Sequence, residues 1–246
     1  MVMDEKQLRA NLDSQIKTLL AEIEQIVPVK FTLWDEDYCA CQLHKDANGN
    51  QVEAEIFYKA PVSQAKLAHE LLHAKTSLTL GDNSIMFNVV NPDKAFIYLM
   101  QHENASNIVN ACEHVIFFPD YLEMGYKEED SFEQAKDLQA RIDELNELVK
   151  NGLKDNGHYS LRVYNYLGLV FTFLFYPIAD RFKKEVKQLR KIDIPLFSIV
   201  KRLRDSCDDL VVEPSNKAFI QNAYLTFAID MNAWMARAFK GAVFTC

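Results

Sequence analysis

Lys66-Leu67-Ala68-His69-Glu70-Leu71-Leu72-His73-Ala74-Lys75 contains the pattern His-Glu-x-x-His. The segment from residue 63 to residue 76 includes no Gly or Pro, and its apolar residues recur at helical spacing, which predicts an amphipathic helix. Ser63 is a residue type that caps helix N-termini, so we expect the helix to begin there. On such a helix His69 and His73 lie one turn apart on the same face.

This spacing indicates a metal site. Neutral imidazole is a good zinc ligand, and two imidazoles one turn apart can bind the same ion. Glu70 follows His69 directly, and a carboxylate beside a metal-activated water is a competent base. We therefore predict His69 and His73 as zinc ligands and Glu70 as the catalytic base. The alternative interpretation is a chance match in which both histidines are ordinary surface residues of an amphipathic helix.

Three short segments before this helix predict strands. Residues 29–34, 38–44 and 51–58 have β-type composition, and the Asp46–Asn50 segment between the last two is rich in turn-forming residues. They predict a small antiparallel sheet packed on the helix that contains His69 and His73.

Helical periodicity predicts most of the remaining structure. The expected helices are residues 4–27, 93–118 (ended by Pro119), 132–149, 159–191, 196–207 and 215–239. The fold class is therefore α+β and mostly helical, with a helical C-terminal half. We expect a metal-binding subdomain over residues 1–125 and a helical subdomain over residues 126–246, joined as one integrated unit.

The helix expected around residues 103–117 contains two candidates for a third ligand. One arc of this helix is rich in Asn, Glu and His and has no Lys or Arg, which is typical of a face directed at a site. Glu113 and His114 lie on this arc. Glu113 also borders the apolar arc, where a carboxylate needs a cation or loses its charge. His114 is the alternative ligand, and it can instead hydrogen-bond a reaction intermediate.

The two helices together resemble the zincin superfamily of zinc metallopeptidases, and Asn110-x-x-Glu113-His114 resembles the second helix of its glutamate-ligand branch, the gluzincins. The resemblance covers roughly residues 50 to 120. It implies a Zn²⁺ ion bound by His69, His73 and Glu113, and a peptide or protein substrate. The sequence departs from the gluzincin pattern by lacking the usual Asn-Glu pair on the second helix and by placing a His beside the Glu.

Composition limits the partners. The formal charge is −8 and the sequence pI is about 5.3, which argues against binding of nucleic acid through its phosphates. The cationic runs at residues 181–184 and 201–204 are interpreted as solvated helix faces. The apolar run at residues 167–178 is too short to span a bilayer, so we expect a buried helix and no membrane partner. Five cysteines and no apolar N-terminal segment are typical of a cytoplasmic protein with reduced thiols.

These observations predict a zinc-dependent metallohydrolase, most consistent with a peptidase, in which Glu70 is the general base for a metal-activated water. The alternative is a catalytically inactive zincin-fold protein with a binding or regulatory role, in which the helical half recognises a partner.

Overall fold

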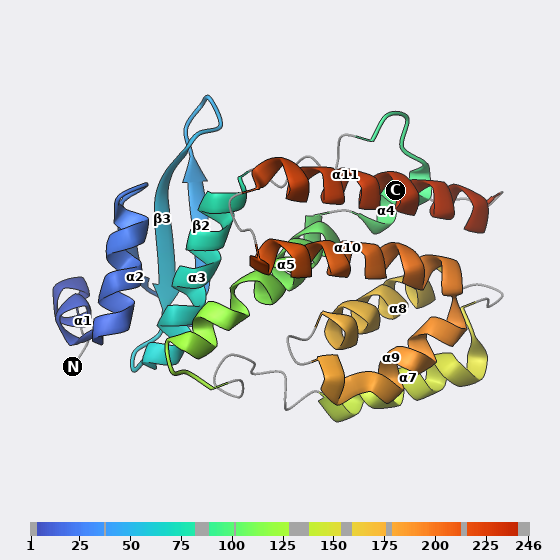
Figure 1. Ribbon diagram of the computed structural model, residues 1–246, viewed down its shortest axis with the longest axis horizontal. Helices are drawn as coiled ribbons and strands as arrows, with labels where there is room; N and C mark the ends of the chain where they lie inside the picture. The colour runs from blue at the N-terminus through green and yellow to red at the C-terminus, as the bar shows by residue number, and fades with distance from the viewer. Residues whose placement is uncertain are drawn as a thin grey trace. The chain divides into compact units, whose positions relative to one another are not determined.

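The computed structural model describes residues 4–36, 38–81, 89–100, 102–127, 138–153, 159–175, 179–212 and 216–240. It confirms an α+β fold that is mostly helical, with one small sheet (Figure 1). The chain forms two compact units that interleave along the sequence. One unit comprises Met1–Gly81 and Phe117–Ala135, and the other comprises Asp82–Ile116 and Lys136–Cys246.

The N-terminal segment forms two helices, where a single helix over residues 4–27 was expected. They are α1 (Glu5–Asn11) and α2 (Ser14–Glu24). Each begins at its own aspartate: the Asp4 side chain accepts a hydrogen bond from the Gln7 backbone N–H, and the Asp13 side chain accepts one from that of Ile16. The cap at Asp13 starts a new helix, which interrupts a hydrophobic pattern that continues through both.

The sheet contains β1 (Val29–Leu33), β2 (Ala40–Lys45) and β3 (Gln51–Tyr58) in the order β1-β3-β2. β2 and β3 are antiparallel as predicted, whereas β1 is parallel to β3, so the sheet is mixed. The strand with the most buried residues, β3, takes the centre. The side chains on its inner face are fully buried on the side of α2 and α3: Ala54, Ile56 and Tyr58.

The predicted helix after β3 is α3 (Gln64–Leu80), shown beside the sheet in Figure 1. The Ser63 hydroxyl accepts a hydrogen bond of 3.1 Å from the Lys66 backbone N–H, which confirms Ser63 as the N-cap. The helix ends at Gly81, whose φ of 85° favours glycine.

The other unit is entirely helical over its described residues. It contains α4 (Lys94–Leu99), the first part of α5 (His102–Glu123), α7 (Leu138–Asn151), α8 (Tyr159–Leu174), η3 (Ala179–Phe182), α9 (Lys183–Ile192), α10 (Ile194–Val212) and α11 (Lys217–Ala238). The apolar run forms much of α8, where Leu169, Val170 and Phe173 are fully buried, as predicted. Pro177, which falls within the expected helix of residues 159–191, lies outside the described residues. Within the described chain, every helix is too short or too polar to cross a membrane.

Helix α5 continues through Pro119 to Glu123, although the sequence predicted an end at Phe118. A proline inside a helix removes one hydrogen bond and costs about 3 kcal/mol. The additional turn contains Tyr121, which is fully buried against Phe118 and Tyr126. Burial of a whole aromatic side chain is worth a comparable amount, which offsets the cost of the proline.

A buried carboxylate, Glu55, lies on the face of the sheet opposite to α3. Its Oε1 accepts hydrogen bonds from Lys30 Nζ at 2.8 Å and from Thr32 Oγ1 at 2.5 Å, and its Oε2 lies 2.8 Å from His44 Nε2. The hydrogen bonds from Lys30 and Thr32, followed by the contact with His44, lower the pKa of Glu55 to about 2.

We expect this carboxylate to stabilise the fold in a pH-dependent way. Because the folded pKa of about 2 lies below the ordinary value of 4.5, the contribution is complete above pH 4.5 and is lost as the pH falls towards 2. Glu55→Gln should therefore lower the free energy of unfolding by about 1–3 kcal/mol at pH 7 and by much less at pH 2.5. Urea unfolding at both pH values measures this, with Glu53→Gln as the control. A Glu55→Gln deficit that is equal at both pH values would contradict it.

Candidate metal centre

Two histidines of the predicted motif lie side by side on the buried face of α3. His69 and His73 are 9% and 8% exposed, so they are not the surface residues of the alternative interpretation. Their Nε2 atoms are 3.0 Å apart and the rings are inclined at 60°. The one-turn spacing on α3 brings these two nitrogens together.

Burial keeps the ring of His69 uncharged. Removal of His69 from water, with a smaller effect of the neighbouring His73, lowers the pKa of His69 to about 3. His69 is therefore neutral at physiological pH, which is the state that a metal ligand requires.

Two aromatic residues of α5 form the wall that buries the histidines. The ring of Phe117 lies edge-on to both imidazoles, at centroid distances of 5.4 Å from His69 and 4.8 Å from His73. Tyr121, one turn later, lies 6.3 Å from the His69 ring. The sequence contained one sign of this arrangement, because Phe117 interrupts the polar arc of its helix. Its contact with both imidazoles was not foreseen.

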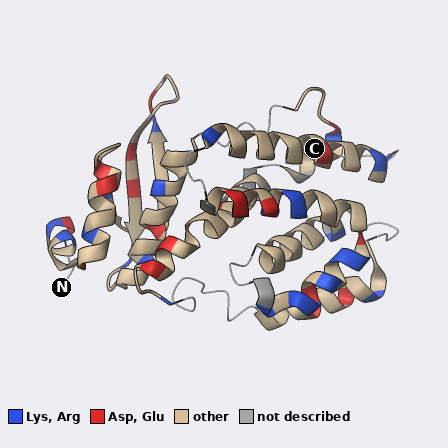
Figure 2. Ribbon diagram, in the orientation of Figure 1, with Lys and Arg blue, Asp and Glu red and all other residues tan. Residues whose placement is uncertain are grey.

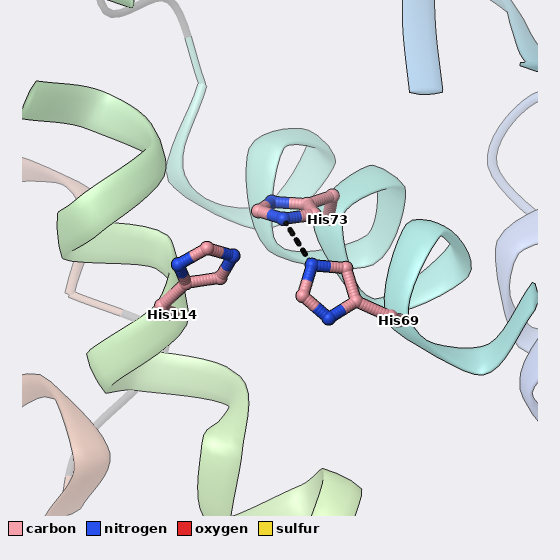
Figure 3. A group of neighbouring side chains, drawn as sticks. All are labelled: His69, His73 and His114. Carbon is pink, nitrogen blue, oxygen red and sulfur yellow. Dashed lines mark hydrogen bonds between the residues drawn. The ribbon is translucent and has the colours of Figure 1, made fainter. Parts of the chain in front are cut away.

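His114 completes a group of three histidines. It lies on the same continuous helix as Phe117, one turn earlier and therefore on a similar face. The potential ligand atoms of His69, His73 and His114 all lie within 4.8 Å of one another. Figure 3 shows the ring of His114 extending from α5 towards the two rings of α3.

The predicted ligand Glu113 is not in this group. Adjacent residues differ by about 100° around a helix, so only one of Glu113 and His114 faces α3 directly. Glu113 is 5% exposed, and burial raises the pKa values of Cys112 and of Tyr224 in α11, with a smaller contribution from Glu113 nearby. The apolar arc beside Glu113, which favoured Glu113 as a metal ligand in the sequence, therefore packs near other buried side chains of the same unit. Zinc binding by Glu113 stays a prediction, and the geometry favours His114.

The predicted base, Glu70, is half-buried on α3, one position after His69. A rotation of about 100° separates the two side chains, so Glu70 lies beside the histidine face without sharing it. The role of Glu70 as the base stays a prediction.

The separation of the His69 and His73 nitrogens fits a tetrahedral zinc ion. Nitrogens bound to zinc at about 2.0–2.1 Å lie roughly 3.3 Å apart. The observed separation of 3.0 Å between His69 and His73 is close to this value, so a small rotation of the rings suffices. Three neutral imidazoles are also a known ligand set of catalytic zinc.

A second group of potential ligands, His44, Glu53 and Glu55, lies on the sheet. Here the ammonium of Lys30 already contacts Glu55, and side chains occupy both of its carboxylate oxygens. A metal ion at this position must displace Lys30 or approach it closely, and both are unfavourable. The group of three histidines is therefore the better metal site.

Comparison of the chain with known protein families, with curated proteins and with solved structures finds no match. The resemblance to zincins consequently depends on the motif and on the geometry described above.

The choice between Glu113 and His114 is open to a direct test. We expect His114→Ala to lower the affinity for zinc by more than about 100-fold, because the loss of a mere outer-shell partner already costs 10–100-fold. Glu113→Gln should retain zinc, since its side chain lies outside the group. Titration of both variants against a competing chelator measures this. His44→Ala, which alters the second group, is the matched control and should bind as tightly as the wild type. Zinc release by Glu113→Gln together with retention by His114→Ala would identify Glu113 as the ligand.

Proposed function

We propose that this protein is a zinc-dependent hydrolase that cleaves peptide bonds. The observation that supports the proposal is that one ring nitrogen from each of His69, His73 and His114 lies within 4.8 Å of the others, on and beside the helix in which Glu70 follows His69. Three protein ligands leave a fourth position on zinc for water or substrate, whereas a structural zinc site has four protein ligands. Across the described residues, this group contains three potential ligands and no fourth.

The residues of this chain have distinct roles in the proposed reaction. His69, His73 and His114 would hold the ion through their ring nitrogens, and Phe117 and Tyr121 exclude water from one side of the imidazole pair. A bound zinc ion supplies a Lewis acid that lowers the pKa of a coordinated water to about 7. Glu70 accepts a proton from the attacking water and later donates it to the leaving amine.

A peptide is the substrate that the sheet favours. β2 is an edge strand of the sheet and lies against α3, the helix of the His-Glu-x-x-His motif. The free backbone groups of an edge strand can pair with an extended peptide, which places its backbone beside that helix. This supports a peptidase over a hydrolase of small amides.

Glu70→Gln tests the proposed base. The amide has nearly the same shape but cannot accept the proton, so we expect kcat to fall by about 10²- to 10⁴-fold. The zinc content and the melting temperature should stay unchanged, because Glu70 is not a ligand. The assay uses the zinc-loaded protein and a random-sequence library of quenched fluorescent peptides.

The matched control is Glu147→Gln, the same chemical change at an exposed position of α7, and it should have full activity. Equal rates for wild type and Glu70→Gln would contradict the assignment of the base. A zinc-loaded wild type that cleaves no peptide of the library would contradict the peptidase proposal.

A further inference from the structure

Helix α9 and the turn before it concentrate positive charge in an acidic protein. Residues 181–191 contain six of the chain's 27 Lys and Arg residues but one of its 35 Asp and Glu residues. The six cationic side chains are all exposed: Arg181, Lys183, Lys184, Lys187, Arg190 and Lys191. Figure 2 shows the blue segments along α9.

The charges of α9 form one stripe. At 100° per residue, its five cationic residues fall within an arc of about 120°. The other side of the helix contains Leu189 and Ile192 together with Glu185, and Leu189 is fully buried where α9 packs against α7, α8 and α10. The interior of this unit therefore fixes the helix with its basic stripe directed outwards. The sequence alone had indicated a short solvated run at residues 181–184, and the fold adds Lys187, Arg190 and Lys191 to the same face.

Most of this stripe has no neutralising carboxylate. Among the residues that the structure describes, Lys184, Lys187, Arg190 and Lys191 form no ion pair. Helix α10 in the same unit is the contrast, because each of its cations has a carboxylate partner. Those pairs are Lys201 with Asp205, Arg202 with Asp230, and Arg204 with Asp208.

The stripe opposes helix formation by itself. Lys183, Lys187 and Lys191 follow one another at i, i+4 spacing, where like charges repel. An external array of negative charge that contacts the stripe would reduce this repulsion.

We propose that the basic stripe of α9, Lys183 to Lys191, is a docking surface for an anionic lipid bilayer. Four to eight Lys and Arg residues on an amphipathic helix are suited to anionic headgroups. Four of the five cations are lysines, whose compact charge suits a diffuse planar array better than bidentate recognition of single phosphates. Ile194 lies two residues beyond the end of α9 and is 57% exposed, which provides an apolar contact at the interface.

A nucleic acid fits this stripe less well. Single strands bind on exposed aromatic side chains between the cations, whereas the one aromatic residue of the segment, Phe182, is buried. The formal charge of −8 also repels a long polyanion that extends beyond one helix, while a planar surface touches the helix alone.

Sedimentation with vesicles tests the proposal on the full-length protein. We expect binding to phosphatidylcholine vesicles that contain about 30% phosphatidylserine at low salt, none to pure phosphatidylcholine, and release at about 0.5 M NaCl, where the Debye length is only a few ångströms. The triple variant Lys184→Gln/Lys187→Gln/Lys191→Gln should bind at least tenfold more weakly.

The control triple variant Lys150→Gln/Lys217→Gln/Lys240→Gln changes the net charge equally at exposed positions outside α9 and should bind like the wild type. Absence of wild-type binding at low salt, or equal loss in both variants, would overturn the proposal. Tighter binding of a 20-base-pair DNA duplex than of the vesicles, abolished by the α9 variant, would replace it with a nucleic-acid surface. The metal centre is not part of this surface, so neither result bears on the hydrolase proposal.

Discussion

The contact of α3 with Phe117 of α5 is the constraint on which the candidate site depends. It removes two imidazoles from water, and burial keeps His69 uncharged. The same helix places His114 one turn before Phe117. A single helix–helix contact thus produces both the protonation state and the position that a metal ligand set requires. Pro119 destabilises α5, but the turn that follows it places the buried Tyr121 beside Phe117 against the histidines.

The sequence predicted the features that depend on neighbouring residues. The cap at Ser63 and the one-turn spacing of His69 and His73 are local, and both are present in the structure. The choice between Glu113 and His114 was not local, since it depends on which side of α5 faces α3. The parallel pairing of β1 with β3 and the continuation of α5 through Pro119 likewise depend on residues distant in the sequence. In each case long-range packing decided between arrangements that the local pattern permitted.

The two groups of potential metal ligands differ in whether a cationic side chain of the protein already contacts them. His44, Glu53 and Glu55 satisfy the same distance criterion as the three histidines. At Glu55, however, the protein supplies the positive charge itself through Lys30, and the pKa of the carboxyl is low without a metal. At the three histidines the ring nitrogens can instead donate lone pairs to an ion from outside.

The hydrogen bond between His69 and His73 has a consequence for how an ion enters. It joins two Nε2 atoms, so one ring has hydrogen on Nε2 and the other has a lone pair there. Coordination through both Nε2 atoms requires two lone pairs. The donor ring must therefore become its other tautomer, with hydrogen on Nδ1 instead. This exchange moves a hydrogen within one ring, so loading at this pair replaces one tautomer by another and releases no net proton. The rate of loading is then sensitive to how readily solvent or a polar group can relay hydrogen from one edge of a buried imidazole to the other.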